Sequence, residues 1–146
     1  MDAHLTTGVL DLPALIGETA APSCGALALF VGTVRDHNEG RPVEAVTYEA
    51  YEPIATKELA QIEREACEKF SVARCRIVHR LGRLAVGEAS LAIVVRSAHR
   101  AAAFEAQRFA IEAVKARVPV WKHEHYVDGE SRYLEGTPLA VPPQRE

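Results

Sequence analysis

Apolar and β-branched residues predict four strands in this chain. Residues 25–34, GALALFVGTV, are almost continuously apolar over the length of a strand, which favours the middle of a sheet. Residues 89–95, ASLAIVV, predict a second apolar strand, and residues 43–51 and 74–81 contain the Val, Ile, Thr and Tyr that strands prefer. Because residues 35–42, RDHNEGRP, form only a short exposed loop, we expect the strand at 43–51 to run antiparallel to the strand at 25–34.

A change of period predicts two main helices. From Pro53 onward the apolar residues recur at helical spacing, in a stripe formed by Ala55, Leu59, Ile62, Ala66 and Phe70. A second helix begins near Arg100, with Ser97 as a candidate N-cap, and Pro119 ends it. The expected buried face of that helix contains Ala102, Ala103, Phe104, Ala106, Phe109, Ala110, Ala113 and Val114.

Shorter elements follow from caps and turns. Asp11 and Pro13 favour the start of a short helix over residues 12–20. Residues 4–10 predict a short edge strand, and residues 82–88, with a glycine near each end, predict a turn-rich connection.

A hairpin completes the expected architecture. Asp128-Gly129, between strand-like residues 120–127 and 131–134, is typical of a type I′ turn. The chain lacks the Gly-rich βα turn of a dinucleotide-binding fold. The economical prediction is an α+β fold, with a mixed, mostly antiparallel sheet and two main helices.

Length and composition limit the class of protein. The 146 residues predict one domain over residues 1–136, followed by a Pro-rich tail at 137–146. No Lys or Arg precedes Arg35, and the apolar runs are too short to span a bilayer. These features predict a cytoplasmic protein without a membrane segment. A net charge of −3 argues against a general nucleic-acid binder.

The cysteines predict neither a disulfide framework nor a metal site. Cys24, Cys67 and Cys75 are odd in number and form no C-x-x-C pair, which favours reduced thiols. Cys67 lies in a helical pattern and Cys75 in a strand pattern, so we interpret both as packing residues. His79 is interpreted as a half-buried strand residue rather than a ligand.

Positive charge is concentrated in one segment of this acidic chain. Between Arg96 and His123 there are six Lys or Arg residues and only two Glu residues, a local charge of +4. His99 and Arg100 fall in the first turn of the second helix, where cations oppose the helix dipole. A bound phosphate or carboxylate would relieve that mismatch, whereas the alternative is a solvated charged face.

Three further cations are candidates for chemistry. Lys115 lies in the last helical turn, where the dipole alone would explain a cation. Lys122 follows Trp121 at the expected start of a strand. A lysine that is partly desolvated and near another cation has a lowered pKa and becomes a usable base or nucleophile. The alternative is that Lys122 is an ordinary surface lysine. Gly32 would let a ligand approach the backbone, and Arg35 would bind its anionic group; the alternative is a turn with a solvated arginine.

Taken together, these segments resemble a known family. FVGTVRDHNEG at residues 30–40, SAHR at 97–100, AFEA at 103–106 and VKARVPVWKHE at 114–124 resemble, in order and spacing, the large catalytic subunit of molybdopterin synthase. The resemblance runs in register from about residue 25 to residue 134, and it implies an α/β-hammerhead-like fold.

The resemblance implies a sulfurtransferase of molybdenum-cofactor biosynthesis. Such enzymes convert cyclic pyranopterin monophosphate to molybdopterin by inserting two dithiolene sulfurs. Sulfur arrives as the C-terminal Gly-Gly thiocarboxylate of a small ubiquitin-like subunit, and neither a metal nor another cofactor is implied. The family works as a heterotetramer, in which a homodimer of large subunits carries one small subunit at each end.

The resemblance also implies roles for individual residues. Lys115 and Lys122 match the catalytic lysines. The positions that match the substrate pocket are Thr33, Val34, Arg35, His99, Arg100, His123 and Glu124. His123 is a departure, because relatives often have Arg there. The phosphate of the substrate suits Arg35, His99 and Arg100, and the lysines suit proton transfer and anion stabilisation.

Helix length adds a geometric expectation. An unbroken helix places Arg100 and Lys115 about 22 Å apart, at 1.5 Å per residue. One small pterin cannot easily contact both residues in a single chain. We therefore predict a pocket shared across a dimer, with Lys115, Lys122 and Arg35 from one subunit and His99 and Arg100 from its mate.

Two other functions remain open from the sequence. In the first, the chain is a non-catalytic module that binds a phosphorylated metabolite, and Lys122 is then dispensable for ligand binding. Alternatively it would be a scaffold that docks a ubiquitin-like protein without affinity for a pterin.

Overall fold

The computed structural model describes residues 3–134, so the predicted tail at 137–146 lies outside the described residues. Within this range the elements are β1 (Leu5–Thr6), α1 (Leu12–Glu18), β2 (Ala26–Thr33), β3 (His37–Asn38), β4 (Arg41–Ala50), α2 (Glu52–Phe70), β5 (Arg74–Arg80), β6 (Gly82–Ala85), β7 (Ala89–Ser97), α3 (Arg100–Arg117), β8 (Val120–Tyr126) and β9 (Ser131–Leu134). The predicted α+β class is confirmed.

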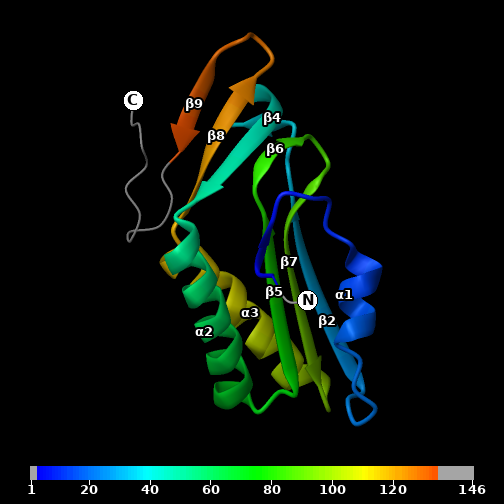
Figure 1. Ribbon diagram of the computed structural model, residues 1–146. Helices are drawn as coiled ribbons and strands as arrows, with labels where there is room; N and C mark the ends of the chain where they lie inside the picture. Colours follow the sequence, from blue (N-terminus) through cyan, green and yellow to red (C-terminus); the bar gives the residue numbers. More distant parts are fainter. Residues whose placement is uncertain (1–2, 135–146) are drawn as a thin grey trace.

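The first sheet is covered by helices on both faces. Its strand order is β1-β5-β7-β2, with β1 parallel to β5 and the other pairs antiparallel. Helices α2 and α3 lie side by side on one face, and the short α1 lies on the other (Figure 1). The main core forms between the sheet and the two long helices, around Ile77, Ile93, Leu59, Ile62 and Ala106.

A second sheet lies beyond the ends of the two long helices. Its strand order is β3-β4-β8-β9, and β6 also pairs with β4 (Figure 1). Its strands contribute Val43, Val46, Leu84 and Tyr126 to a smaller core, which Val34 completes. The second sheet carries the C-terminal end of the cation-rich segment.

The apolar stripes predicted for the two long helices are confirmed with one exception. Ala55, Leu59, Ile62 and Ala66 of α2 are buried, and the alanines of α3 meet them and the sheet. Arg117 fastens the helices together, because its guanidinium contacts Glu58 at 3.0 Å and Glu65 at 2.7 Å. Phe104 was expected in the core, but it is 66% exposed.

The helix starts differ from one another. Asp11 caps α1 as predicted, since its side chain accepts a hydrogen bond from the Ala14 N–H. The N-cap of α3 is His99, without a side-chain hydrogen bond. The prediction of Ser97 was wrong because β7 extends through that residue and buries it.

Two expectations about strand neighbours were wrong. The apolar strand β2 is the edge of the first sheet, with Leu27 and Leu29 exposed, because the short α1 covers only part of that face. Strand β4 does not pair with β2. A bulge at Gly32/Thr33 disrupts the pairing of β2 with β7, and the chain then enters the second sheet.

The turns also differ from the predictions. Residues 82–88 contain the strand β6, and residues 35–42 contain β3 and the start of β4. The two consecutive positive φ values of a type I′ turn occur at Glu39 and Gly40, between β3 and β4. In the β8–β9 hairpin only Gly129 has a positive φ, which fits a three-residue loop with a bulge instead.

No helix within residues 3–134 is both long and apolar enough to cross a membrane.

Candidate functional site

Alternation along β8 separates its residues onto two faces. Lys122 lies opposite Tyr48 of β4, and Glu124 lies opposite Val46, which belongs to the smaller core. Lys122 and Glu124 therefore project from the inner face of the second sheet. Trp121 projects from the other face, where its indole N–H donates to Glu49 at 2.9 Å.

Lys122 has the environment of an activated lysine. Burial lowers the pKa of its amine, and the positive charges of Lys115 and Arg35 lower it further, while the carboxylate of Glu124 acts in the opposite direction. Lys115 projects from the last turn of α3 and is exposed. Within residues 3–134 neither lysine has an ion-pair partner.

A hydrogen-bond network fixes Glu124. Its side chain is only 4% exposed. Its Oε1 accepts hydrogen bonds from the Tyr126 hydroxyl at 2.9 Å and from Asn38 Nδ2 at 3.1 Å. Asn38 Oδ1 in turn accepts from Arg35 Nη2 at 3.3 Å. The network therefore connects the end of β2 to β8 through the small strand β3.

The half-buried Tyr48 and the buried His79 form an aromatic pair near the lysines. Their ring centroids lie 5.1 Å apart in an edge-on arrangement. Burial raises the pKa of Tyr48, while its hydrogen bond with Ser90 lowers that pKa. His79 donates from Nδ1 to the carbonyl oxygen of Arg80 at 2.9 Å, and burial lowers the pKa of His79 to about 4, helped by the charge of Lys115. His79 is therefore neutral near pH 7, and it is more deeply buried than expected.

The residues predicted at the end of β2 differ in exposure. Thr33 and Arg35 are exposed, so their side chains are accessible to a ligand. The side chain of Val34 is buried in the smaller core, and its backbone N–H donates to the Glu88 carbonyl at 3.0 Å. Val34 thus fixes the course of the chain on which Thr33 and Arg35 are presented.

The two ends of α3 present separate groups of cations. The helix is unbroken over 18 residues, as the separation of Arg100 from Lys115 requires. His99 and Arg100 are exposed at its N-terminal end. One chain therefore brings together Arg35, Lys115, Lys122 and Glu124 and leaves His99 and Arg100 at a distance.

His123 projects from the opposite face of β8 to its two neighbours. Its ring stacks on Tyr133 at 4.2 Å between centroids and lies 4.7 Å from His125. His125 Nε2 is in turn 2.8 Å from the hydroxyl of Thr47. Within one chain the structure therefore does not bring His123 to the side of Lys122 and Glu124.

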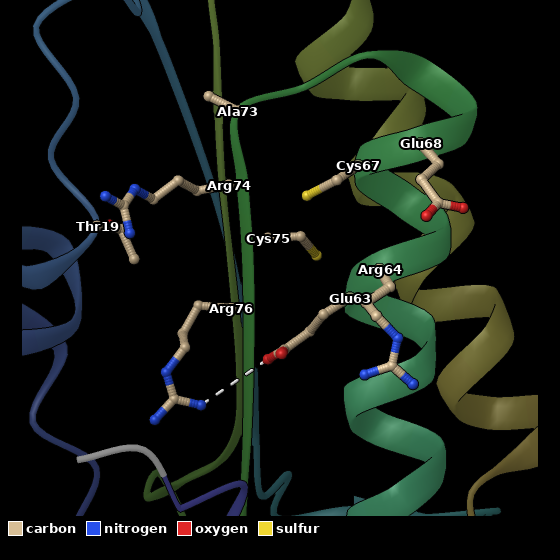
Figure 2. A pocket seen from close by; sticks show the side chains of 9 residues that line it. All are labelled: Thr19, Glu63, Arg64, Cys67, Glu68, Ala73, Arg74, Cys75 and Arg76. Atoms are coloured by element: carbon tan, nitrogen blue, oxygen red, sulfur yellow. Dashed lines mark ion pairs between the residues drawn. The ribbon is translucent and has the colours of Figure 1, made fainter.

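A cavity of about 350 Å³ lies elsewhere, between α2 and β5. Figure 2 shows the side chains of Cys67 and Cys75 reaching into the space between these elements, and Glu63 near Arg76. None of the predicted site residues lines it. Burial raises the pKa of both thiols, so little reactive thiolate forms near neutral pH and the interpretation as packing residues is supported.

Three polar residues of the site were absent from the sequence-based prediction: Asn38, Tyr48 and Tyr126. Tyr48 and Tyr126 share the inner face with Lys122 and Glu124. Strand alternation predicts this shared face only once the pairing of β4 with β8 is known. Asn38 lies in a segment that was expected to be only a loop. Among residues 3–134 no group of three His, Cys, Asp or Glu side chains is arranged to hold a metal ion.

Comparisons with known proteins agree on one family. A family model described as "MoaE protein" matches residues 5–117. The molybdopterin synthase catalytic subunit of Bacillus subtilis is 43% identical over 127 residues, covering 87% of this chain and 81% of that protein. The Bos taurus protein of the same name is 48% identical over 113 residues, which are 77% of this chain but 60% of the bovine protein. The chain thus spans less than two thirds of the length of that relative.

Solved structures agree as well. Molybdopterin synthase from Staphylococcus aureus superposes with a TM-score of 0.86 at 36% identity, covering 91% of this chain and 96% of that one. A complex of subunits 1 and 2 of the molybdopterin-converting factor from Helicobacter pylori gives a TM-score of 0.74 at 25% identity, covering 94% and 92%.

Proposed function

Because this chain belongs to the MoaE protein family, we propose that it is the catalytic subunit of a molybdopterin synthase. In this function it is a sulfurtransferase that converts cyclic pyranopterin monophosphate to molybdopterin. The observation that carries the proposal is the cluster on the inner face of the second sheet. There, a lysine with a lowered pKa lies near a second lysine, an arginine and a buried carboxylate.

The cluster suits sulfur transfer from a thiocarboxylate. The sulfur of the carrier's C-terminal thiocarboxylate forms a bond to a carbon of the pterin side chain, while the bond from that carbon to its oxygen substituent breaks and the departing oxygen takes up a proton. Water then cleaves the bond between that sulfur and the acyl carbon, which leaves sulfur on the pterin and a carboxylate on the carrier. Lys122 exchanges the required protons because its lowered pKa makes the neutral amine accessible. Lys115 stabilises the developing anion.

The substrate pocket is shared between two copies of the chain. Lys115, Lys122, Arg35, Thr33 and Glu124 come from one subunit, and His99 and Arg100 come from its mate. Two observations support this arrangement. The unbroken α3 separates the two groups of cations, and the exposed Phe104 lies one turn beyond Arg100, where a second subunit would cover it.

The partner is a small ubiquitin-like subunit with a C-terminal Gly-Gly, and the assembly is a heterotetramer around a homodimer. The Helicobacter pylori complex, which contains two subunits of a molybdopterin-converting factor, supports a two-subunit enzyme. The proposal includes a cytoplasmic location and no cofactor beyond the thiocarboxylate.

The decisive experiment supplies cyclic pyranopterin monophosphate and a thiocarboxylated small subunit, and measures molybdopterin formation. We expect turnover with the unmodified chain and its loss in Lys122→Ala. Lys57→Ala, which removes an exposed lysine of α2, is the matched control. Pterin binding without turnover would favour the non-catalytic module. Binding of the small subunit without pterin affinity would favour the scaffold.

A further inference from the structure

Asn38 occupies a fixed position between two residues of the proposed pocket. It ends the two-residue strand β3, and its partner in the hairpin is Arg41. The turn that joins them has positive φ values at both Glu39 (51°) and Gly40 (82°). Such a two-residue turn holds the flanking residues in a single register, so the side chain of Asn38 is delivered to one place.

The amide of Asn38 contacts two side chains of opposite charge. Its Nδ2 donates to Glu124 Oε1 at 3.1 Å, and its Oδ1 accepts from Arg35 Nη2 at 3.3 Å. An amide is suited to this position because it offers a donor at one end and an acceptor at the other.

Arg35 and Glu124 do not form an ion pair with each other in the described part of the chain. Asn38 makes the one side-chain hydrogen bond of Arg35 there, so most of the guanidinium donors stay unused. A direct Arg35–Glu124 pair would occupy those donors in a bidentate contact, which is the geometry that arginine and carboxylates favour. It would compete with any anionic ligand.

We propose that Asn38 is a positioning residue that keeps Arg35 and Glu124 apart. As a neutral spacer, it satisfies both side chains and leaves the remaining Arg35 donors for the phosphate of the substrate. This inference rests on the proposed function, and it assigns a role to the HNEG segment at residues 37–40 that no other part of the proposed mechanism uses.

Two substitutions separate this role from a structural one. Asn38→Asp is nearly isosteric, but its carboxylate repels Glu124 and pairs with Arg35. Asn38→Ala removes both contacts and allows the direct pair. In both variants a carboxylate pairs with Arg35 and takes donors that the phosphate would otherwise use. We therefore expect the KM for the pterin phosphate to rise roughly ten- to a hundred-fold, with a much smaller change in kcat. The matched control is Asp36→Asn, because the Asp36 side chain is exposed and, among residues 3–134, hydrogen-bonds only to His37.

The result that overturns the inference is a KM within about twofold of the unmodified chain in both Asn38 variants. Equally, an unchanged KM together with a lowered melting temperature would assign Asn38 a merely structural role. Calorimetric binding of the pterin phosphate, measured without the small subunit, keeps this test distinct from that of the proposed function. An unmodified chain that binds the pterin but never forms molybdopterin contradicts the proposed function. Equal Kd values for that chain and Asn38→Asp contradict the role of Asn38.

Discussion

Lys122 of β8 lies directly opposite Tyr48 of β4, and burial acts on both of their titratable groups. It lowers the pKa of the amine and raises the pKa of the phenol, because removal from water disfavours the charged form of each. The pair therefore forms a desolvated patch in which a lysine can lose its proton while its neighbour keeps one.

The first prediction concerns Lys122. Lys122→Ala should lower kcat for molybdopterin formation by about a hundred-fold or more, which is the usual contribution of a positioned acid or base. Because the pKa of Lys122 is lowered, any activity that requires its neutral amine should rise with pH below the range of an ordinary lysine. Steady-state rates from pH 6 to pH 10 measure both effects. A kcat close to that of Lys57→Ala would contradict the role of Lys122.

The second prediction concerns the shared pocket. Lys115→Ala and Arg100→Ala chains should each be inactive as homodimers, and a mixed dimer should recover part of the activity. One of its two pockets then contains both substitutions, and the other contains neither. Rates of a reassembled equimolar mixture measure the recovery. No recovery, despite mixed dimers detected by native mass spectrometry, would place all the cations in one chain's pocket.

The third prediction concerns the stability of the fold in acid. The pKa of His79 is lowered from 6.5 to about 4 by burial, so the unfolded chain binds a proton in this range more readily than the folded chain. The contribution of neutral His79 to the free energy of unfolding is therefore fully present above pH 6.5, and it falls as the pH drops toward 4. Between pH 7 and pH 5 this group should account for about 2 kcal/mol of the loss.

Urea denaturation of the unmodified chain and His79→Gln at both pH values measures this contribution. Loss of the buried imidazole contacts will lower the absolute stability of the variant, so the comparison is between the pH dependences. The same pH dependence in both chains would show that another group is responsible.

The fourth prediction concerns the connection between α2 and α3. Arg117 contacts Glu58 and Glu65, and all three side chains are about two thirds buried or more. Arg117→Gln should reduce the free energy of unfolding by about 1 kcal/mol, and less at high salt, because the contacts are ionic. Arg108→Gln is the control, since Arg108 is exposed on the same helix. Equal stabilities of the two variants would mean that the ion pairs contribute nothing measurable.

Features that depend on local periodicity were predictable from the sequence. The stripe of α2, the unbroken α3 and the Asp11 cap are local, and each was found where it was expected. Phe104 is the informative exception. Its apolar side chain suggests a core position, but helical geometry places it on the outer face of α3, together with Arg100. The sequence pattern alone did not distinguish the outer face of this helix from the inner one.

Features that depend on pairing between distant strands were not predictable. The apolarity of β2 did not reveal that it lies at an edge, because the sequence does not state which strands are neighbours. The same limit applies to the site. The family motifs supplied Lys122, His123 and Glu124 as one contiguous run, and only the pairing of β8 with β4 shows that His123 projects from the other face. Asn38 was missed because its partners lie at the end of β2 and 86 residues further along the chain.

The two-residue connection at residues 118–119, between α3 and β8, has a consequence for how this protein can vary. Side chains in a strand change faces with every residue, so a single insertion or deletion in this connection that shifts β8 by one residue against β4 would exchange Lys122 and Glu124 for Trp121 and His123. Such a chain could keep its sheet, its helices and its composition while presenting an indole and an imidazole to the pterin. Length changes in this connection are therefore restricted to even numbers of residues, whichever amino acids the connection contains.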